Sequence, residues 1–325
     1  MKKIWVSIFL STTLVIVTSC DQRKEPYKAA TYYSYLVLPQ STDEAIQTAT
    51  TFHYAFVDTR TALQGKLFIF LGGTGSTPQN YSAINKTATK LGYHVINLIY
   101  PNTIDGQACK NRSDPNCFEN YHEEMIFGGT QSDLIAVNAA NSISNRILKL
   151  LQRLNNLNPN NGWNQFYEGS ELTYSKFVVS GHSQGGGHAA YLGQKFAVDR
   201  VVLFSSPNDY SEVENQPANW CRVEFATPAD RFYGLMHKRD ETLDIAKQYA
   251  IWKGMSMLTA IDTSSADGST YSNYNALVAN FEPNSKAVTL PLYHNLTAQD
   301  YALPSGDELA HLKQVWIHLI GKSQR

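Results

Sequence analysis

Short apolar runs alternate with longer amphipathic stretches along most of the chain. Eight runs have the length and composition of strands, namely residues 32–38, 52–57, 66–71, 94–100, 177–180, 201–204, 231–237 and 287–292. Three stretches show the 3.6-residue periodicity of helices, at 81–91, 132–157 and 307–320. Strands that alternate with helices predict an α/β fold with a mostly parallel sheet covered on both faces. The first two strands are expected to pair antiparallel.

The segment from about residue 101 to 129 lacks a clear period and is interpreted as an irregular insertion before the long helix. Two cysteines, Cys109 and Cys117, flank a polar loop inside this insertion. In an exported protein such a pair is expected to form a disulfide, with two free thiols as the alternative. Cys221 is then left as a buried free thiol. The cysteines lack the accompanying spacing of a metal site, so no metal is expected.

The first residues differ in character from all that follow. Residues 1–3 are short and basic, residues 4–17 are apolar but too short to span a bilayer comfortably, and Val17-Thr18-Ser19-Cys20 follows. We interpret 1–19 as a secretory signal peptide. Its ending resembles a bacterial lipoprotein box, which implies an exported cell-envelope protein anchored to a membrane through lipidated Cys20. An ordinary signal peptide with an incidental cysteine is the alternative.

The remainder of the chain is predicted to be one domain. Polar residues 20–30 form a tether, and no composition break divides 31–325. The 27 basic and 28 acidic residues give a net charge of −1 without a basic stripe. Nucleic acid is therefore not an expected partner.

The most informative motif is Gly181-His182-Ser183-Gln184-Gly185, directly after the strand at 177–180. A G-x-S-x-G between a strand and a helix is typical of a nucleophile elbow, whose tight turn exposes the serine hydroxyl. Glycine at both flanking positions removes the clash that side chains would cause there. The sequence therefore predicts Ser183 as a nucleophile, against the alternative of an inert serine in an ordinary turn.

A serine nucleophile needs a histidine base and an acid that orients the histidine. In proteins built on such an elbow, the acid and then the histidine follow later strands. His294, after the run at 287–292, is the predicted base, because His188, His237, His311 and His318 lie on helices or beside the acid loop. Asp240, after the run at 231–237, is the predicted acid. Glu241 and Asp209 remain its rivals.

Two backbone N–H groups must also stabilise the oxyanion of the tetrahedral intermediate. One is predicted to come from Gln184, which follows the nucleophile. The other is predicted to come from Thr74 or Gly73, in the loop Gly72-Gly73-Thr74-Gly75 after the strand at 66–71. A P-loop is excluded because no Lys-Ser/Thr pair follows these glycines.

With these motifs, residues 60–322 resemble the α/β-hydrolase superfamily. The chain is similar to bacterial secreted and lipoprotein serine hydrolases that share the elbow Gly-His-Ser-Gln-Gly-Gly-Gly-His-Ala-Ala and a cysteine-bracketed insertion. The resemblance implies an α/β-hydrolase fold and hydrolysis of carboxylic esters without a cofactor. The first oxyanion loop has Gly72 where many esterases carry histidine. At this loop the resemblance therefore assigns only backbone groups, and no side chain, to oxyanion binding.

Three functions remain open at this point. The first is a serine esterase that acts on a small-molecule or glycan ester. The second is an inactive, membrane-tethered binding protein on the same scaffold. The third is an acyltransferase or amidase that uses the same triad. Fold alone does not decide among them.

Overall fold

The computed structural model describes residues 31–258, 264–268, 274–284 and 291–321. The predicted signal peptide, Cys20 and the tether lie outside these residues, as does most of the predicted strand at 287–292. Within the described residues, no helix is long and apolar enough to cross a membrane.

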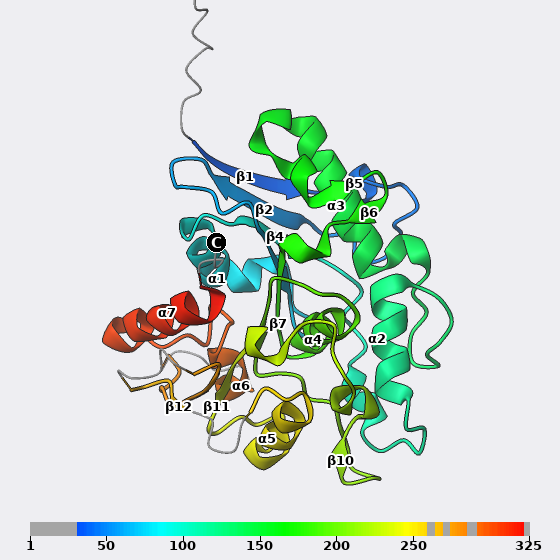
Figure 1. Ribbon diagram of the computed structural model, residues 1–325, viewed down its shortest axis with the longest axis vertical. Helices are drawn as coiled ribbons and strands as arrows, with labels where there is room; N and C mark the ends of the chain where they lie inside the picture. Colours follow the sequence, from blue (N-terminus) through cyan, green and yellow to red (C-terminus); the bar gives the residue numbers. More distant parts are fainter. Residues whose placement is uncertain (1–30, 259–263, 269–273, 285–290, 322–325) are drawn as a thin grey trace, which may run out of the picture. The chain divides into compact units, whose positions relative to one another are not determined.

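One large sheet carries the candidate site (Figure 1). Among the described residues it has nine strands in the order β1-β2-β4-β3-β7-β8-β11-β13-β12. β1 pairs antiparallel with β2, and β2 pairs antiparallel with β4; all other neighbours are parallel. The strands are β1 (Tyr32–Val37), β2 (His53–Asp58), β3 (Leu67–Leu71), β4 (His94–Leu98), β7 (Phe177–His182), β8 (Arg200–Phe204), β11 (Phe232–His237), β12 (Ser264–Ser265) and β13 (Ala276–Ala279).

Helices cover both faces of this sheet (Figure 1). The helices are α1 (Ser82–Lys90), α2 (Cys117–Phe127), α3 (Ile143–Leu157), α4 (Gln184–Lys195), α5 (Ile245–Gly254), α6 (Leu292–Leu296) and α7 (Gly306–Ile320). Two further antiparallel pairs lie outside the sheet, β5 (Tyr167–Glu168) with β6 (Glu171–Leu172) and β9 (Tyr210–Ser211) with β10 (Gln216–Pro217).

Side-chain alternation along the strands separates two hydrophobic cores. In β3, Leu67, Ile69 and Leu71 pack in one core, whereas Phe68 and Phe70 pack in the other. The first core lies under α2, α3, α4 and α5, and the second lies under α1 and α7. Strands buried on both faces are the reason these runs are continuously apolar. The predicted α/β class and mostly parallel sheet are therefore confirmed.

The long helix is shorter than the periodicity of 132–157 predicts. α3 begins at Ile143, where the Ser142 hydroxyl accepts the N–H of Asn145. The preceding residues form a loop held by the buried carboxylate of Glu124, which accepts the N–H groups of Ser132 and Val137. Apolar residues in this loop keep a helix-like spacing because they fill the core from an irregular backbone.

The insertion is also more regular than its sequence suggests. It contains α2, whose residues Cys117, Phe118, Tyr121 and Met125 are buried in the first core. The predicted disulfide joins Cys109 to Cys117, with 5.5 Å between the Cα atoms, and so anchors the start of α2. Cys221 is a buried free thiol, as expected.

Candidate active site

The elbow places Ser183 at the junction of β7 and α4 with a positive φ of 53° and a ψ of −125°. This conformation is rare for a residue with a side chain and stores strain of about 1–3 kcal/mol. A Cβ on Gly181 would lie 2.2 Å from the carbonyl oxygen of Gly185, and one on Gly185 would lie 2.1 Å from that of Leu71. Only glycine fits these two positions, so the turn can close and present the serine at the end of the strand.

Asp240 and His294 meet although 54 residues separate them in sequence. The His294 Nδ1 lies 2.8 Å from the Asp240 Oδ2, and both side chains are less than 10 % exposed. Burial opposes ionisation of Asp240, but the charge and hydrogen bond of His294 and the N–H groups of Thr242 and Leu243 lower the pKa of Asp240 below its ordinary value. The carboxylate therefore stays ionised and holds the imidazole in one orientation.

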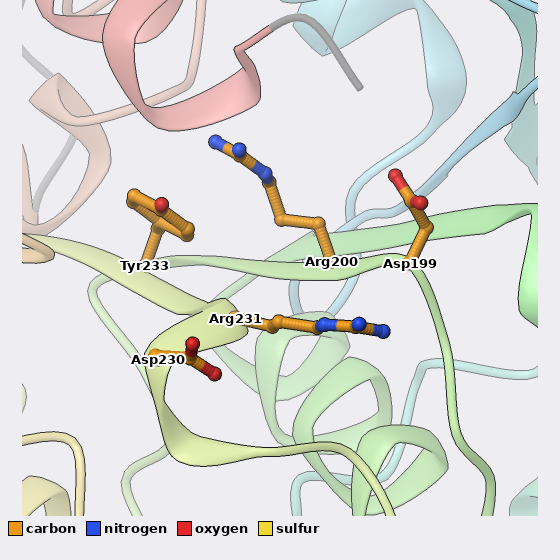
Figure 2. Close-up of a pocket in the computed structure, with 5 residues that line it drawn as sticks. All are labelled: Asp199, Arg200, Asp230, Arg231 and Tyr233. Carbon is orange, nitrogen blue, oxygen red and sulfur yellow. The ribbon is translucent and has the colours of Figure 1, made fainter. Parts of the chain in front are cut away.

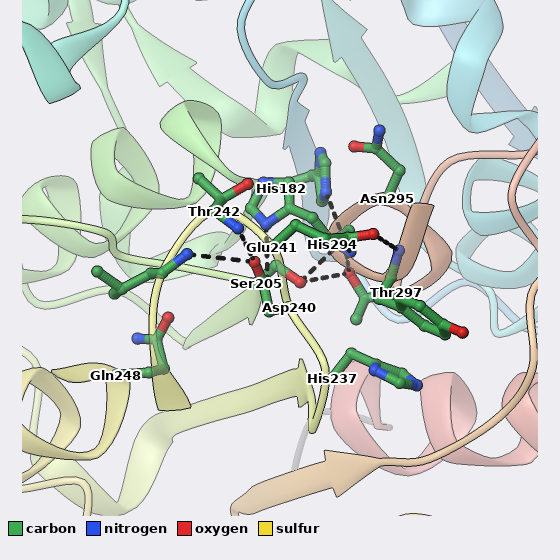
Figure 3. A network of polar contacts seen from close by, with 12 residues as sticks. His182, Ser205, His237, Asp240, Glu241, Thr242, Gln248, His294, Asn295 and Thr297 are labelled. Atoms are coloured by element: carbon green, nitrogen blue, oxygen red, sulfur yellow. Dashed lines mark hydrogen bonds and ion pairs between the residues drawn. The ribbon is translucent and has the colours of Figure 1, made fainter. Parts of the chain in front are cut away.

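Other side chains hold the backbone of His294 (Figure 3). Its carbonyl oxygen accepts from His182 Nε2 at 3.1 Å and from the Ser205 hydroxyl at 3.0 Å. Since a carbonyl can only accept, His182 carries its proton on Nε2. Burial and the neighbouring His294 lower the pKa of His182 to about 3, so this ring remains neutral.

Glu241 anchors the helix that carries His294. Its carboxylate accepts the N–H groups of Leu292, Tyr293 and His294 at 3.0–3.1 Å. These are the free donors at the start of α6, where a negative charge is also favoured by the helix dipole. His294 thus lies on α6, and most of the strand predicted before it, at 287–292, lies outside the described residues.

The two rivals of Asp240 have other partners in this structure. Glu241 contacts the backbone of α6, as described above. Asp209 accepts from His122 Nε2 at 2.7 Å and from the Trp220 indole at 2.8 Å. Of the three carboxylates weighed from the sequence, Asp240 is the one whose hydrogen bond reaches the ring of His294.

The remaining histidines after the elbow lie elsewhere. His188 is buried on α4, and His237 ends β11 with its Nε2 beside the carbonyl oxygen of Phe281. His311 packs against the Phe281 ring, and the His318 Nε2 lies 2.8 Å from the Tyr274 carbonyl oxygen.

Ser183 and His294 line one cavity but make no hydrogen bond to each other in this structure. The His294 Nε2 is buried and has no hydrogen-bond partner among the described residues. It is the ring nitrogen opposite the Asp240 bond, which is the position a base uses toward a nucleophile. Catalytic hydrogen bonds of this kind are often long without substrate and shorten when substrate binds.

The two candidate oxyanion loops lie against each other at the elbow. The Thr74 hydroxyl lies 2.7 Å from the Gln184 Oε1, and the backbone N–H groups of Thr74 and Gln184 have no acceptor among the described residues. Gly73 differs, because its N–H already donates to the Tyr81 hydroxyl at 2.9 Å. Of the two alternatives in this loop, Thr74 is therefore the better candidate donor. Gly73 packs against the elbow, where an added Cβ would lie 3.1 Å from the Ser183 Cβ.

The cavity at this site has a volume of about 460 Å³ and mostly polar walls. Besides the residues already named, its lining includes hydroxyl, amide and carboxylate groups from Ser76, Asn80, Asp105, Thr242, Asn295, Gln299 and Tyr301. Neither lysine nor arginine is among its described lining residues. In the described part of the chain, no group of three or more His, Cys, Asp or Glu residues is arranged to hold a metal ion.

A second cavity, of about 190 Å³, lies at the other ends of the strands (Figure 2). Its walls are Asp199, Arg200, Asp230, Arg231 and Tyr233. Arg200 lies over the Tyr233 ring at 4.1 Å and donates to the carbonyl oxygen of Leu319 at the end of α7. A cation at a helix C-terminus is stabilising, so Arg200 has a structural task there.

No protein-family model matches the chain, and a search of curated proteins found no relative. Among solved structures the chain is similar to a Klebsiella pneumoniae protein assigned as a dienelactone hydrolase, with 10 % identity and a TM-score of 0.43. The match covers 89 % of this chain and 98 % of the other. So weak a likeness carries no argument about activity. The strand order, the elbow after β7 and the Asp240 loop after β11 themselves have the α/β-hydrolase arrangement that the sequence resemblance implied.

Because His182 is neutral in the folded protein down to a pKa of about 3, it links stability to pH. The unfolded state takes up a proton on this ring near pH 6.5, whereas the folded state does not. The contribution of this ring to the free energy of unfolding is therefore complete above pH 6.5 and is lost as the pH falls toward 3. At pH 4 the loss is roughly 3 kcal/mol. We expect His182→Gln to reduce the difference in unfolding free energy between pH 7 and pH 4, measured by urea denaturation. Equal pH dependence in both proteins would contradict this.

Proposed function

We propose that this protein is a serine hydrolase that cleaves carboxylic esters through Ser183, His294 and Asp240. The observation that carries the proposal is the strained Ser183 in one cavity with His294, whose Nδ1 is held by Asp240 at 2.8 Å. Backbone strain of this kind persists only where the surroundings impose it, and it is concentrated at functional sites.

In the first half of the reaction, the Ser183 side chain rotates about its Cα–Cβ bond so that its hydroxyl donates to His294 Nε2. The Ser183 Oγ attacks the acyl carbon while Nε2 takes its proton. The carbonyl oxygen becomes an oxyanion that accepts from the N–H groups of Thr74 and Gln184. Asp240 stabilises the imidazolium formed. The C–O bond then breaks, and His294 returns the proton to the leaving alcohol.

In the second half, water replaces the alcohol. His294 removes a proton from the water as its oxygen attacks the acyl-enzyme carbon, and the same N–H groups bind the second oxyanion. Collapse releases the carboxylic acid and restores the Ser183 hydroxyl with the proton held by His294. The alcohol, the acid and the free enzyme balance the ester and water consumed.

The cavity walls favour a short acyl group and a hydroxyl-rich alcohol, such as a glycan ester. Its described lining residues include no leucine, isoleucine, valine, phenylalanine, methionine or tryptophan, and Pro291 is the one proline, so they offer little aliphatic surface to a long acyl chain. Amide and hydroxyl groups from Asn80, Thr242 and Gln299 are suited to hydrogen bonds with sugar hydroxyls. Polar walls of this kind would lose hydrogen bonds to water without replacing them if an alkyl chain filled the cavity.

We also propose that the enzyme acts outside the cytoplasm, anchored through Cys20. The Cys109–Cys117 disulfide supports export, because such bonds persist in oxidising compartments. An anchored enzyme with a polar cavity would meet its substrate at the membrane surface rather than within the lipid.

Ser183→Ala should lower kcat for a nitrophenyl ester by about 10⁶-fold, since the nucleophile is removed. The wild type should be labelled by a fluorophosphonate probe at Ser183, and the variant should not. Ser180→Ala is the matched control, because Ser180 is buried in β7 and its hydroxyl has no partner among the described residues. An unlabelled wild type would favour the non-catalytic binding protein. A labelled wild type without esterase activity would favour acyl transfer or amide cleavage.

Two variants should distinguish the two carboxylates: Asp240→Asn tests the orientation of the His294 ring, and Glu241→Gln tests the anchoring of α6. Asp240→Asn removes the charge that faces the imidazolium and should lower kcat by about 10⁴-fold. Glu241→Gln keeps one carbonyl acceptor for the start of α6 and should lower kcat by about tenfold or less. Steady-state kinetics on both variants test the assignment. A larger loss for Glu241→Gln would reverse the roles of the two residues.

A series of nitrophenyl esters tests the proposed acyl group. We expect kcat/KM to be at least about tenfold higher for the acetate than for the decanoate, because the described cavity wall is more polar than apolar and has no large aliphatic side chain to pack against the longer chain. Release of acetate from acetylated glycans should accompany this preference. A steady rise of kcat/KM with chain length would overturn the substrate class while leaving the triad in place.

A further inference from the structure

Behind the elbow lies a buried row of polar side chains that the proposed triad does not use. Asp209 follows β8, His122 lies on α2 and His188 lies on α4. The His122 Nε2 is 2.7 Å from the Asp209 Oδ2, and the His122 Nδ1 is 2.8 Å from the His188 Nδ1. All three residues are at most 6 % exposed. Such a row is costly to bury unless every polar group has a partner.

The row continues to the oxyanion loops. The His188 Nε2 lies 3.5 Å from the Gln184 Nε2, the longest link, and the Gln184 Oε1 lies 2.7 Å from the Thr74 hydroxyl. Gln184 and Thr74 are the two residues whose backbone N–H groups are the candidate oxyanion donors. Hydrogen bonds, buried except at the exposed Thr74 end, therefore connect the Asp209 carboxylate to both halves of the candidate oxyanion hole.

The donors can be assigned in one direction along the whole row. The Gln184 amide nitrogen can only donate, so it makes the His188 Nε2 an acceptor and leaves the ring proton on the His188 Nδ1. That proton points to the His122 Nδ1, which must then accept, and the His122 Nε2–H donates to Asp209. The Thr74 hydroxyl donates to the Gln184 Oε1. Each donor thus points away from the cavity and toward Asp209.

Packing around the row keeps these rings in place. His188 stacks on Tyr121, with 5.6 Å between ring centroids and 26° between planes, and His122 stacks on Tyr191 at 5.4 Å and 23°. Burial and the neighbouring His122 lower the pKa of His188 well below its ordinary value, which agrees with a neutral ring. The Trp220 indole donates to the same Asp209 oxygen as His122.

We propose that Asp209, His122 and His188 are positioning residues for the oxyanion hole, acting through the side chain of Gln184 on Thr74. The inference rests on the proposed function, because it assumes that these backbone N–H groups receive the oxyanion. The row holds the Gln184 amide in one orientation, and that amide holds the loop of Thr74 against the elbow. Displacement of a donor by a fraction of an ångström weakens a bond that matters most in the transition state.

A double-mutant cycle tests the coupling. His188→Leu interrupts the row, and Thr74→Val removes the hydroxyl at its end while keeping the backbone N–H. We expect each to lower kcat about 10-fold to 100-fold with little change in KM. Because both substitutions break the same connection, the kcat of the double variant should lie within about threefold of the kcat of the less active single variant. Each kcat is calculated from the active-site concentration measured by fluorophosphonate titration, so that unfolded protein does not lower the value. Fully additive losses would overturn the proposal.

His94→Leu is the matched control. His94 is another buried histidine whose pKa is lowered by burial. It begins β4 and does not line the cavity, and its Nε2 contacts the Asn161 carbonyl oxygen. It should lower thermal stability without lowering kcat per titrated site. An equal loss of kcat in this variant would assign the effect of His188→Leu to general destabilisation.

Affinity for a trifluoromethyl ketone gives a second readout, because its adduct with Ser183 carries an oxyanion. His188→Leu should weaken this inhibitor by about the same factor as kcat, and Asp209→Asn by a smaller factor. Unchanged affinity together with reduced kcat would count against the oxyanion hole as the affected part.

Nitrogen NMR of the wild-type rings tests the row without any activity. The His188 proton should be on Nδ1 and the His122 proton on Nε2, and Gln184→Leu should shift the His188 signals. A His188 proton on Nε2 would overturn the proposed direction even in an active enzyme. If the wild type takes no fluorophosphonate label, the proposed function fails, while this measurement still decides whether the row exists.

Discussion

The candidate site depends on how closely three backbone segments approach each other at the elbow. A side chain at Gly181 would collide with the carbonyl of Gly185, and one at Gly185 would collide with the carbonyl of Leu71. Without these glycines, α4 could not begin so near the ends of β7 and β3. The strained Ser183 is held there from both sides, because its N–H donates to the Phe204 carbonyl and its own carbonyl accepts from Gly186 and Gly187. Hydrogen bonds from neighbouring elements thus offset the backbone strain of about 1–3 kcal/mol.

Placement of the histidine follows a different physical rule. α6 has five residues, too few for a helix that is stable by itself. It is held by groups at both ends, with Glu241 at its first N–H groups and with His182 and Ser205 at the carbonyl of His294. These contacts come from β7, β8 and the loop after β11, the neighbouring strand ends of one sheet. The sheet therefore sets the position of His294 through several modest hydrogen bonds rather than through the helix.

The sequence predicted the parts of this arrangement that depend on local pattern. Apolar runs located the parallel strands from β3 to β11, because strands buried on both faces need continuous apolar residues. The elbow is recognisable in the sequence because its five residues, Gly181 to Gly185, are consecutive in the chain. The end of the long helix was predicted well but its start was not, since Leu134 and Val137 keep a helical spacing in a loop that Glu124 holds. The sequence pattern did not predict α2, because polar residues such as His122 and Glu124 are buried on it beside the apolar ones and obscure the helical periodicity.

The contacts of Glu241 and His122 had no sequence signal for a related reason. Each is formed with residues at least 51 positions away, and an acidic residue beside Asp240 looks the same whether it caps a distant helix or faces solvent. Only three-dimensional neighbours distinguish the cases. Asp209 illustrates this point: it was a reasonable rival for the triad acid by position, yet its partner is a different histidine.

In the proposed reaction, the two buried carboxylates Asp240 and Asp209 would have different electrostatic effects. Asp240 is in direct contact with His294 and so would favour the imidazolium that the proposed attack by Ser183 forms. A second negative charge equally close to the oxyanion would oppose its formation. In the proposed row, two neutral imidazoles and an amide separate Asp209 from Thr74. The carboxylate can then polarise the row and fix its direction without placing its charge beside the reacting oxygen. Because of this separation, the row near the proposed oxyanion hole can end in a carboxylate, Asp209. The proposed base, His294, by contrast needs the carboxylate of Asp240 in direct contact with its ring.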